Sequence, residues 1–193
     1  MSNPIDHAVS VYCASSADCS PEFHAAAYRL GELLARDGRA VVYGGGRFGS
    51  MGALADGALA SGGQVIGVLP EFLRALELAH DHLTELHIVE DMRVRKHQML
   101  MRGSAVVALP GGCGTLEELL EVITLKRLGV YFKPIVIVNT RRYFDPLIAL
   151  FAAAVEERFM EPQHLALWRV VDTPEEALSF LASTSSAQDQ PAT

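Results

Sequence analysis

The chain has 193 residues, enough for one domain with a substantial core, and half of them are hydrophobic, as in an ordinary globular protein. A formal net charge of −7 excludes the broad basic surface that binds nucleic acid, and no apolar run is long enough to cross a membrane. Because the first residues lack the basic-then-apolar order of a signal peptide, we expect a cytoplasmic protein.

Short apolar segments alternate with amphipathic segments along most of the chain. The apolar segments are typical of strands covered on both faces, and we predict strands at Ala8–Cys13, Ala40–Tyr43, Val65–Leu69, Leu86–Val89, Ala105–Leu109, Ile135–Val138 and Arg169–Val171. We predict helices from Pro21 up to Gly38, and at Ser50–Ala60, Met92–Met101, Thr115–Leu128 and Phe144–Phe159. This alternation predicts an α/β fold, a three-layer sandwich in which helices cover both faces of a mostly parallel sheet.

No repeat or linker divides the chain, so we predict a single domain over residues 1–182. Residues 183–193 are small and polar, and we expect them to form a disordered tail. The cysteines, Cys13, Cys19 and Cys113, are too few and too scattered for a disulfide framework. The seven histidines form no metal-binding motif, so we expect no metal.

The stretch "VVYGGGRFGSMG" contains the first of two glycine-rich loops. Gly44, Gly46 and Gly49 satisfy G-x-G-x-x-G between a predicted strand and a predicted helix, which suggests a dinucleotide site. Glu71, beyond the next strand, could bind a ribose of such a ligand. The pattern usually follows the first strand, however, whereas this loop follows the second. A tight turn with close helix–strand packing is the alternative interpretation.

The stretch "LPGGCGTLEE" contains the second glycine-rich loop, at the carboxyl end of a strand, where ligands bind in such sheets. Few side chains obstruct its backbone N–H groups, and the following helix adds partial positive charge at its N-terminus. Thr115 can cap that helix or bind the anion. We therefore predict a phosphate site, in preference to a plain capped turn, at the N–H groups of Gly111, Gly112, Cys113 and Gly114.

Charged residues of both signs accompany this loop. Glu117 and Glu118 are helical neighbours that point about 100° apart, so they cannot both face one ligand equally. Arg93, Arg95 and Lys96 lie close together in a predicted helix, and such residues supply the cations that a phosphate dianion requires. A solvated basic helix face is the alternative interpretation of these three residues.

These stretches together resemble the Lonely Guy (LOG) family, whose members are often mislabelled lysine decarboxylases. The family signature P-G-G-x-G-T-x-x-E is met by residues 110–118. A second signature, Met followed after two residues by Arg-Lys, is met by Met92, Arg95 and Lys96. Further stretches such as "VYCASS" and "GGQVIGVLPEFL" also match, so the similarity runs over nearly the whole chain.

The resemblance implies a Rossmann-like nucleotide-binding fold, no cofactor, and a homodimer with sites near the subunit interface. Members of the family are nucleoside 5′-monophosphate phosphoribohydrolases, which cleave the N-glycosidic bond of cytokinin riboside 5′-monophosphates, and often of AMP, to free base and ribose 5-phosphate. The resemblance implies that Glu118 and Arg95 are catalytic. The substrate-binding residues that it implies are Lys96, Gly111, Gly112, Gly114, Thr115, Gly45, Gly46, Glu77, Thr124 and Ser15.

The sequence departs from the family at positions that bear on the choice of base. Family members usually have His where Arg93 stands, small residues where Arg47 and Phe48 stand, and Trp where Leu125 stands. Two other functions stay open at this stage. One is a non-catalytic carrier or sensor of a phosphorylated ligand, such as a molybdenum-cofactor carrier. The other is an NAD(P) oxidoreductase that uses the first glycine-rich loop.

Overall fold

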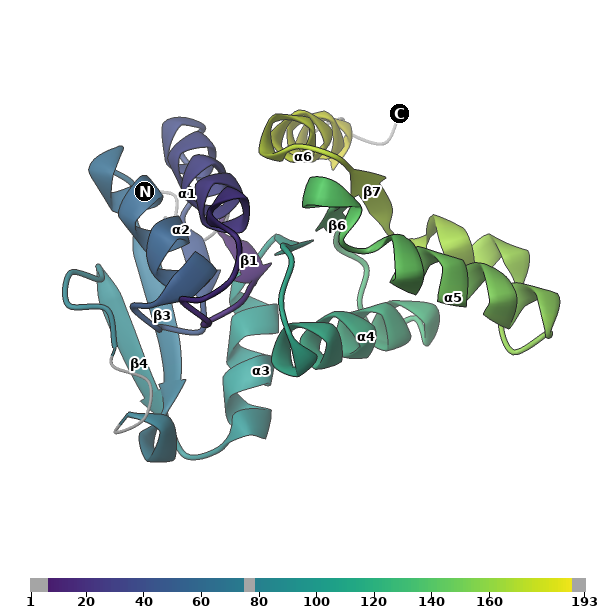
Figure 1. The fold of residues 1–193 in the computed structure, drawn as a ribbon, viewed down its shortest axis with the longest axis horizontal. Helices are drawn as coiled ribbons and strands as arrows, with labels where there is room; N and C mark the ends of the chain where they lie inside the picture. Colours follow the sequence, from purple (N-terminus) through teal and green to yellow (C-terminus); the bar gives the residue numbers. More distant parts are fainter. Residues whose placement is uncertain (1–6, 75–78, 189–193) are drawn as a thin grey trace.

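The computed structural model describes residues 7–74 and 79–188 and consists of strands that alternate with helices (Figure 1). The strands are β1 (Val9–Tyr12), β2 (Val41–Tyr43), β3 (Val65–Pro70), β4 (Glu85–Val89), β5 (Ala105–Ala108), β6 (Ile135–Val138) and β7 (Arg169–Val171). The helices are α1 (Pro21–Arg36), α2 (Gly49–Ala60), α3 (Met92–Arg102), α4 (Cys113–Arg127), α5 (Asp145–Glu156) and α6 (Pro174–Gln188), with 3₁₀ turns at Glu71–Leu73, Thr140–Arg142 and Pro162–Leu167. Each predicted strand is confirmed to within one residue at either end.

The strands form one sheet in the order β4-β3-β2-β1-β5-β6-β7, and every neighbouring pair is parallel. Strand β1 is central, because Val9 pairs with Val41 of β2 on one side and with Ala105 of β5 on the other. The chain first adds strands outward to β4 and then returns to place β5 beside β1. Such a reversal opens a crevice at the carboxyl ends of β1 and β5, where ligands bind in open α/β sheets.

Helices cover both faces of the sheet (Figure 1). Helices α1, α2 and α6 pack on one face, where they bury apolar side chains such as Leu54 and Leu181. Helices α3, α4 and α5 cover the other face and bury side chains such as Met99 and Leu119. The predicted three-layer α/β sandwich is therefore confirmed. No helix within residues 7–74 and 79–188 is long and apolar enough to cross a membrane.

Helix α6 is the element that the sequence predictions missed. Its sequence is rich in small, acidic and hydroxyl residues. Of the side chains described up to residue 184, only a narrow stripe, including Ala177 and Leu181, is buried against the rest of the fold. A helix with so few apolar positions gives a weak periodic signal. The helix continues to Gln188, so the first part of the expected disordered tail is helical. Residues 189–193 lie outside the described residues, and their disorder stays a prediction.

The turn after α5 places a non-glycine residue in a strained conformation. Arg158 has a φ of +64°, in the left-handed region, where the N–H of Phe159 reaches back to the carbonyl of Ala154 at 2.8 Å. Glycine adopts this conformation without the steric cost of a Cβ. We expect Arg158→Gly to raise the free energy of unfolding in urea by about 1 kcal/mol. Arg36→Gly, within α1, should lower it, and changes of the same sign would contradict this account.

Candidate active site

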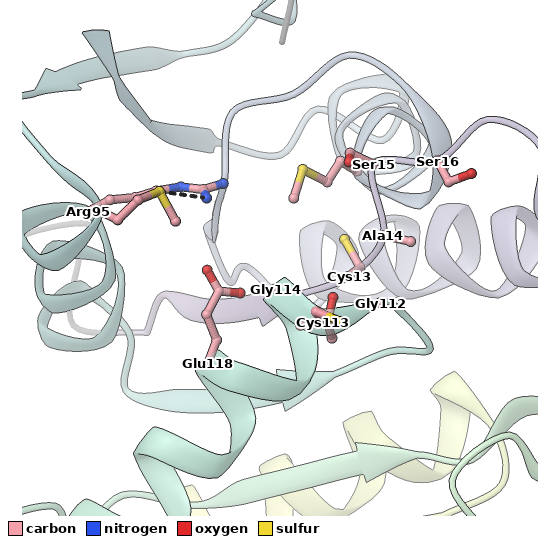
Figure 2. Close-up of a pocket in the computed structure, with 12 residues that line it drawn as sticks. Cys13, Ala14, Ser15, Ser16, Arg95, Gly112, Cys113, Gly114 and Glu118 are labelled. Atoms are coloured by element: carbon pink, nitrogen blue, oxygen red, sulfur yellow. Dashed lines mark hydrogen bonds between the residues drawn. The ribbon is translucent and has the colours of Figure 1, made fainter. Parts of the chain in front are cut away.

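A pocket of about 300 Å³ lies at the carboxyl ends of β1 and β5 (Figure 2). The loop after β1 forms one wall, the loop after β5 and the start of α4 form another, and α2 and α3 contribute side chains. The lining residues are Cys13, Ala14, Ser15, Ser16, Met51, Met92, Arg95, Gly112, Cys113, Gly114, Thr115 and Glu118. The structure thus brings together six of the residues proposed from sequence, namely Ser15, Arg95, Gly112, Gly114, Thr115 and Glu118.

The N-terminus of α4 presents backbone donors to this pocket. The helix begins at Cys113, two residues earlier than predicted, with Gly112 as its N-cap and no side-chain cap in the described structure. Thr115 is therefore the third residue of the helix, and the suggestion that it caps the helix is wrong. A Cβ added at Gly112 or Gly114 would meet no atom within 4 Å, so the space beside the uncapped N–H groups is open. Open N–H groups at a helix N-terminus favour an anion such as phosphate.

Gly111 supports this loop from behind and does not line the pocket. A Cβ at Gly111 would collide with the side chain of Thr115, so only glycine permits this close approach. Its carbonyl accepts a hydrogen bond from the hydroxyl of Tyr143 at 2.6 Å. The glycines of the second loop therefore divide between those that leave space for a ligand and one that lets the chain pack.

Glu118 is the acidic group of the pocket. Its side chain is on the second turn of α4, only 6% of it is exposed, and its carboxylate points into the cavity (Figure 2). Its pKa is raised to about 7, mainly by burial, with smaller upward contributions from Glu117 and Glu121 that Arg95 and Lys96 oppose. Glu117, on the adjacent helix position, is half exposed, as expected for neighbours that point in different directions.

Arg95 is the cation of the pocket, and only 5% of it is exposed. Its Nε donates to the carbonyl of Val68 at 3.1 Å and its Nη2 to the carbonyl of Gly44 at 3.2 Å. Its Nη1 lies 3.8 Å from Sδ of Met92, a weak acceptor. Two backbone carbonyls therefore fix the guanidinium at the pocket wall, while Nη1 keeps donors for substrate oxygens.

The first glycine-rich loop is explained by packing around this arginine. A Cβ at Gly44 would collide with the guanidinium of Arg95, and a Cβ at Gly49, whose φ is +61°, would collide with the carbonyl of Ser16. The close-packing interpretation of this loop therefore accounts for its glycines. Neither Gly45 nor Gly46 lines the pocket. Gly45 has a φ of +84°, and the carbonyl of Gly46 accepts a hydrogen bond from the hydroxyl of Tyr43 at 3.1 Å.

Two other residues proposed from sequence, Lys96 and Thr124, do not line the pocket in this structure. Lys96 forms ion pairs with Glu117 and, at 3.2 Å, with Glu121. Together with Arg93 it lines a separate groove between α3 and α4. Thr124 is exposed and donates to the carbonyl of Leu120 at 2.8 Å. Glu77 lies outside the described residues. Of the three clustered cations, only Arg95 therefore lines the pocket.

Sequence reasoning missed several lining residues, namely Cys13, Ala14, Ser16, Met51 and Met92. The residues after β1 could have been found, because a central strand beside a topology reversal always contributes its following loop to the crevice. Met92 sits one helical turn before Arg95, so the same helix face predicts it. In the part of the chain that the structure describes, no group of three or more His, Cys, Asp or Glu side chains could hold a metal ion.

Comparison with known proteins identifies relatives over most of the chain. The family model described as "Possible lysine decarboxylase" matches residues 51–181. A cytokinin riboside 5′-monophosphate phosphoribohydrolase of Rhodococcoides fascians is 44% identical over 160 residues, which cover 82% of this chain and 81% of that protein. One from Arabidopsis thaliana is 41% identical over 154 residues, which cover 80% and 72%.

Solved structures with the same architecture are more distant in sequence. A molybdenum cofactor carrier protein of Chlamydomonas reinhardtii superposes with a TM-score of 0.70 at 21% identity, covering 92% of this chain and 96% of that one. The molybdenum cofactor binding protein of Rippkaea orientalis superposes with a TM-score of 0.70 at 20% identity, and the match covers 92% of this chain and 97% of that one. At these identities the likeness shows the fold alone. The matched family model and the relatives above 40% identity go further: the chain belongs to the Lonely Guy family of cytokinin riboside 5′-monophosphate phosphoribohydrolases.

Proposed function

We propose that this protein hydrolyses the N-glycosidic bond of nucleoside 5′-monophosphates, cytokinin riboside 5′-monophosphates or AMP, to free base and ribose 5-phosphate. The observation that carries the proposal is the buried carboxylate of Glu118, which faces a pocket that also contains the uncapped N-terminus of α4. A carboxylate beside a phosphate site is costly unless it interacts with positive charge that develops during a reaction. The relatives more than 40% identical are named as phosphoribohydrolases, and their reaction develops such a charge.

Binding of the phosphate positions the sugar in this scheme. The N–H groups of Cys113, Gly114 and Thr115 face the anion at the start of α4, and the helix dipole favours its negative charge. Arg95 offers Nη1 to a phosphate or ribose oxygen. Contacts with the non-reacting phosphate thereby hold the ribose C1′ at a constant place beside Glu118.

The chemical step creates positive charge on the ribose. As the bond between C1′ and the base breaks, its electron pair leaves with the base, which takes up a proton from solvent, and the sugar becomes an oxocarbenium-like ion. The ionised carboxylate of Glu118 stabilises this charge and accepts a proton from the water that attacks C1′. The burial of this side chain strengthens both effects, since electrostatic interactions weaken in water.

The description "Possible lysine decarboxylase" does not fit the lysines of this chain. Such an enzyme requires a lysine that forms a Schiff base with pyridoxal phosphate. Lys96 pairs with two carboxylates, Lys126 donates to the carbonyl of Lys133 at 2.8 Å, and Lys133 donates to the carbonyl of Gly103 at 2.6 Å. These are the only lysines in the sequence, and none lines the pocket, although burial lowers the pKa of Lys126 and Lys133.

Incubation of the purified protein with AMP and with isopentenyladenosine monophosphate tests the proposal. Chromatography should detect free base and ribose 5-phosphate, and the relative rates would rank the two substrates. Folded protein that leaves both nucleotides intact but binds them tightly would contradict the proposal and favour the carrier alternative. The identities of about 20% to the molybdenum-cofactor proteins do not by themselves support that alternative.

The pH dependence of the rate follows from the pKa of Glu118. Burial raises that pKa to about 7, and the reaction requires the ionised form. We therefore expect kcat/KM to be level above pH 8 and to fall about tenfold per pH unit well below pH 7. Initial rates between pH 5 and pH 9, at substrate concentrations below KM, would measure this fall, the acid limb of the pH–rate profile. A limb centred near pH 4.5, the usual value for a glutamate, would show that burial does not control the group.

The assembly proposed for the protein is a homodimer with sites near the subunit interface. Its support is a set of exposed apolar side chains at the end of α3 and around the end of α4, among them Met101, Leu128, Val130 and Phe132. Where exposed apolar side chains form one contiguous patch, the patch often marks a contact surface. Light scattering on the purified protein would give the mass. The cytoplasmic location and the roles of Lys96, Thr124 and Glu77 in binding stay predictions.

A further inference from the structure

The loop between β6 and α5 touches the loop after β5 and the start of α1, the helix that follows the loop after β1. From this loop, Tyr143 donates its hydroxyl to the carbonyl of Gly111 at 2.6 Å, in the loop after β5. Its ring packs edge-on against Phe23 of α1, with centroids 5.8 Å apart. Arg141 pairs with Glu22 at 2.8 Å, at the start of α1. The β6–α5 loop therefore connects the two sides of the crevice from outside.

This loop is held in an unusual backbone conformation. Arg141 and Arg142 have φ values of +56° and +59°, two successive non-glycine residues in the left-handed region. The buried amide of Asn139 holds the turn, because its Oδ1 accepts from the N–H of Phe144 at 2.7 Å and its Nδ2 donates to Asp145 at 2.8 Å. Strained conformations persist only where the surroundings enforce them, and they concentrate at functional sites. Here the strained turn places Tyr143 against Gly111.

The contact with Gly111 controls the direction of a backbone donor. The carbonyl of Gly111 and the N–H of Gly112 belong to one planar trans peptide, so they point in opposite directions. Because Tyr143, which does not line the pocket, holds the carbonyl, the N–H of Gly112 points away from Tyr143, and Gly112 itself lines the pocket. A peptide between two glycines is also the easiest to rotate, since neither residue has a Cβ. Rotation would replace a donor for phosphate with an acceptor.

We propose that Tyr143 is a positioning residue, whose hydroxyl holds the Gly111–Gly112 peptide in the orientation that binds the substrate phosphate. The inference rests on the proposed function, because it assigns the phosphate of that substrate to this loop. Tyr143 touches no reacting atom, so its removal weakens binding of substrate and transition state alike. Such a loss appears in KM and leaves kcat largely unchanged.

The test compares Tyr143→Phe with Tyr28→Phe. The first variant loses only the hydroxyl and keeps the ring contacts. The second loses the hydroxyl of a tyrosine of similar overall exposure, 42% against 41%, which lies on α1 and does not line the pocket. We expect Tyr143→Phe to raise KM for AMP, and the Kd of ribose 5-phosphate in calorimetry, about tenfold, with kcat within about threefold. Tyr28→Phe should change neither.

Hydrogen–deuterium exchange gives a second readout that does not depend on activity. Peptides covering residues 109–118 should exchange faster in Tyr143→Phe, whereas peptides from the sheet should be unchanged and the melting temperature should be preserved. Unchanged KM, Kd and exchange in a folded Tyr143→Phe would overturn the inference. If the wild type releases no base, the proposed function fails, and the exchange of residues 109–118 still decides whether Tyr143 holds the loop.

Discussion

Glu118→Gln should release base from AMP about 10³-fold more slowly than the wild type, because the amide can neither stabilise the developing positive charge nor accept a proton from water. The loss should appear in kcat, since the interaction strengthens only as charge develops. Chromatographic rates at saturating AMP measure it. Glu117→Gln is the matched control, since it changes the adjacent, half-exposed carboxylate, which is outside the pocket, and it should keep most of the activity.

Glu118→Gln should be at least as stable as the wild type, so a loss of activity in this variant can be distinguished from a loss of folding. The pKa of Glu118 is about 7 in the folded chain instead of the usual 4.5, so the folded state holds this proton more tightly than the unfolded state. Its contribution is therefore most favourable below pH 4.5 and is lost as the pH rises through 7. At pH 8, Glu118→Gln should raise the free energy of unfolding, measured in urea, by up to about 3 kcal/mol. At pH 4 it should change this free energy little. An equal loss of stability at both values would contradict the assigned burial.

Arg95→Met should lower kcat/KM for AMP at pH 7 by about 10²-fold or more, for two reasons that can be separated. The variant loses the donors that Arg95 offers to the substrate. It also removes the positive charge that lowers the pKa of Glu118, so the acid limb of the pH profile should move above 7. Part of the activity should then return at pH 9.

Arg95→Lys and Arg102→Met distinguish these effects. The lysine variant keeps the charge near Glu118 but not the planar donors, so its acid limb should stay close to that of the wild type while kcat/KM falls. Arg102 is the last residue of α3, outside the pocket, and its replacement should leave the rate near that of the wild type. An unshifted acid limb in a folded Arg95→Met would contradict the proposal that Arg95 lowers the pKa of Glu118.

Much of the architecture could be predicted because its signals are local. The continuous apolar strands indicate a sheet that is covered on both faces, and each was located to within one residue. Helix α6 escaped detection because its contact with the fold is narrow, and only packing against the sheet and α1 makes its few apolar residues informative.

The sequence by itself predicted a glycine-rich loop that leads into a helix and the separation of Glu117 from Glu118, because these residues are contiguous and their geometry follows from the backbone. The helix nevertheless begins two residues earlier than predicted. Only the tertiary structure decided which cation lines the pocket, because Arg95 is held by the carbonyls of Gly44, just after β2, and of Val68, within β3. It also decided the raised pKa of Glu118 and the contact of Tyr143 with Gly111. Burial and long-range hydrogen bonds depend on segments distant in sequence, and no local pattern encodes the distance between them.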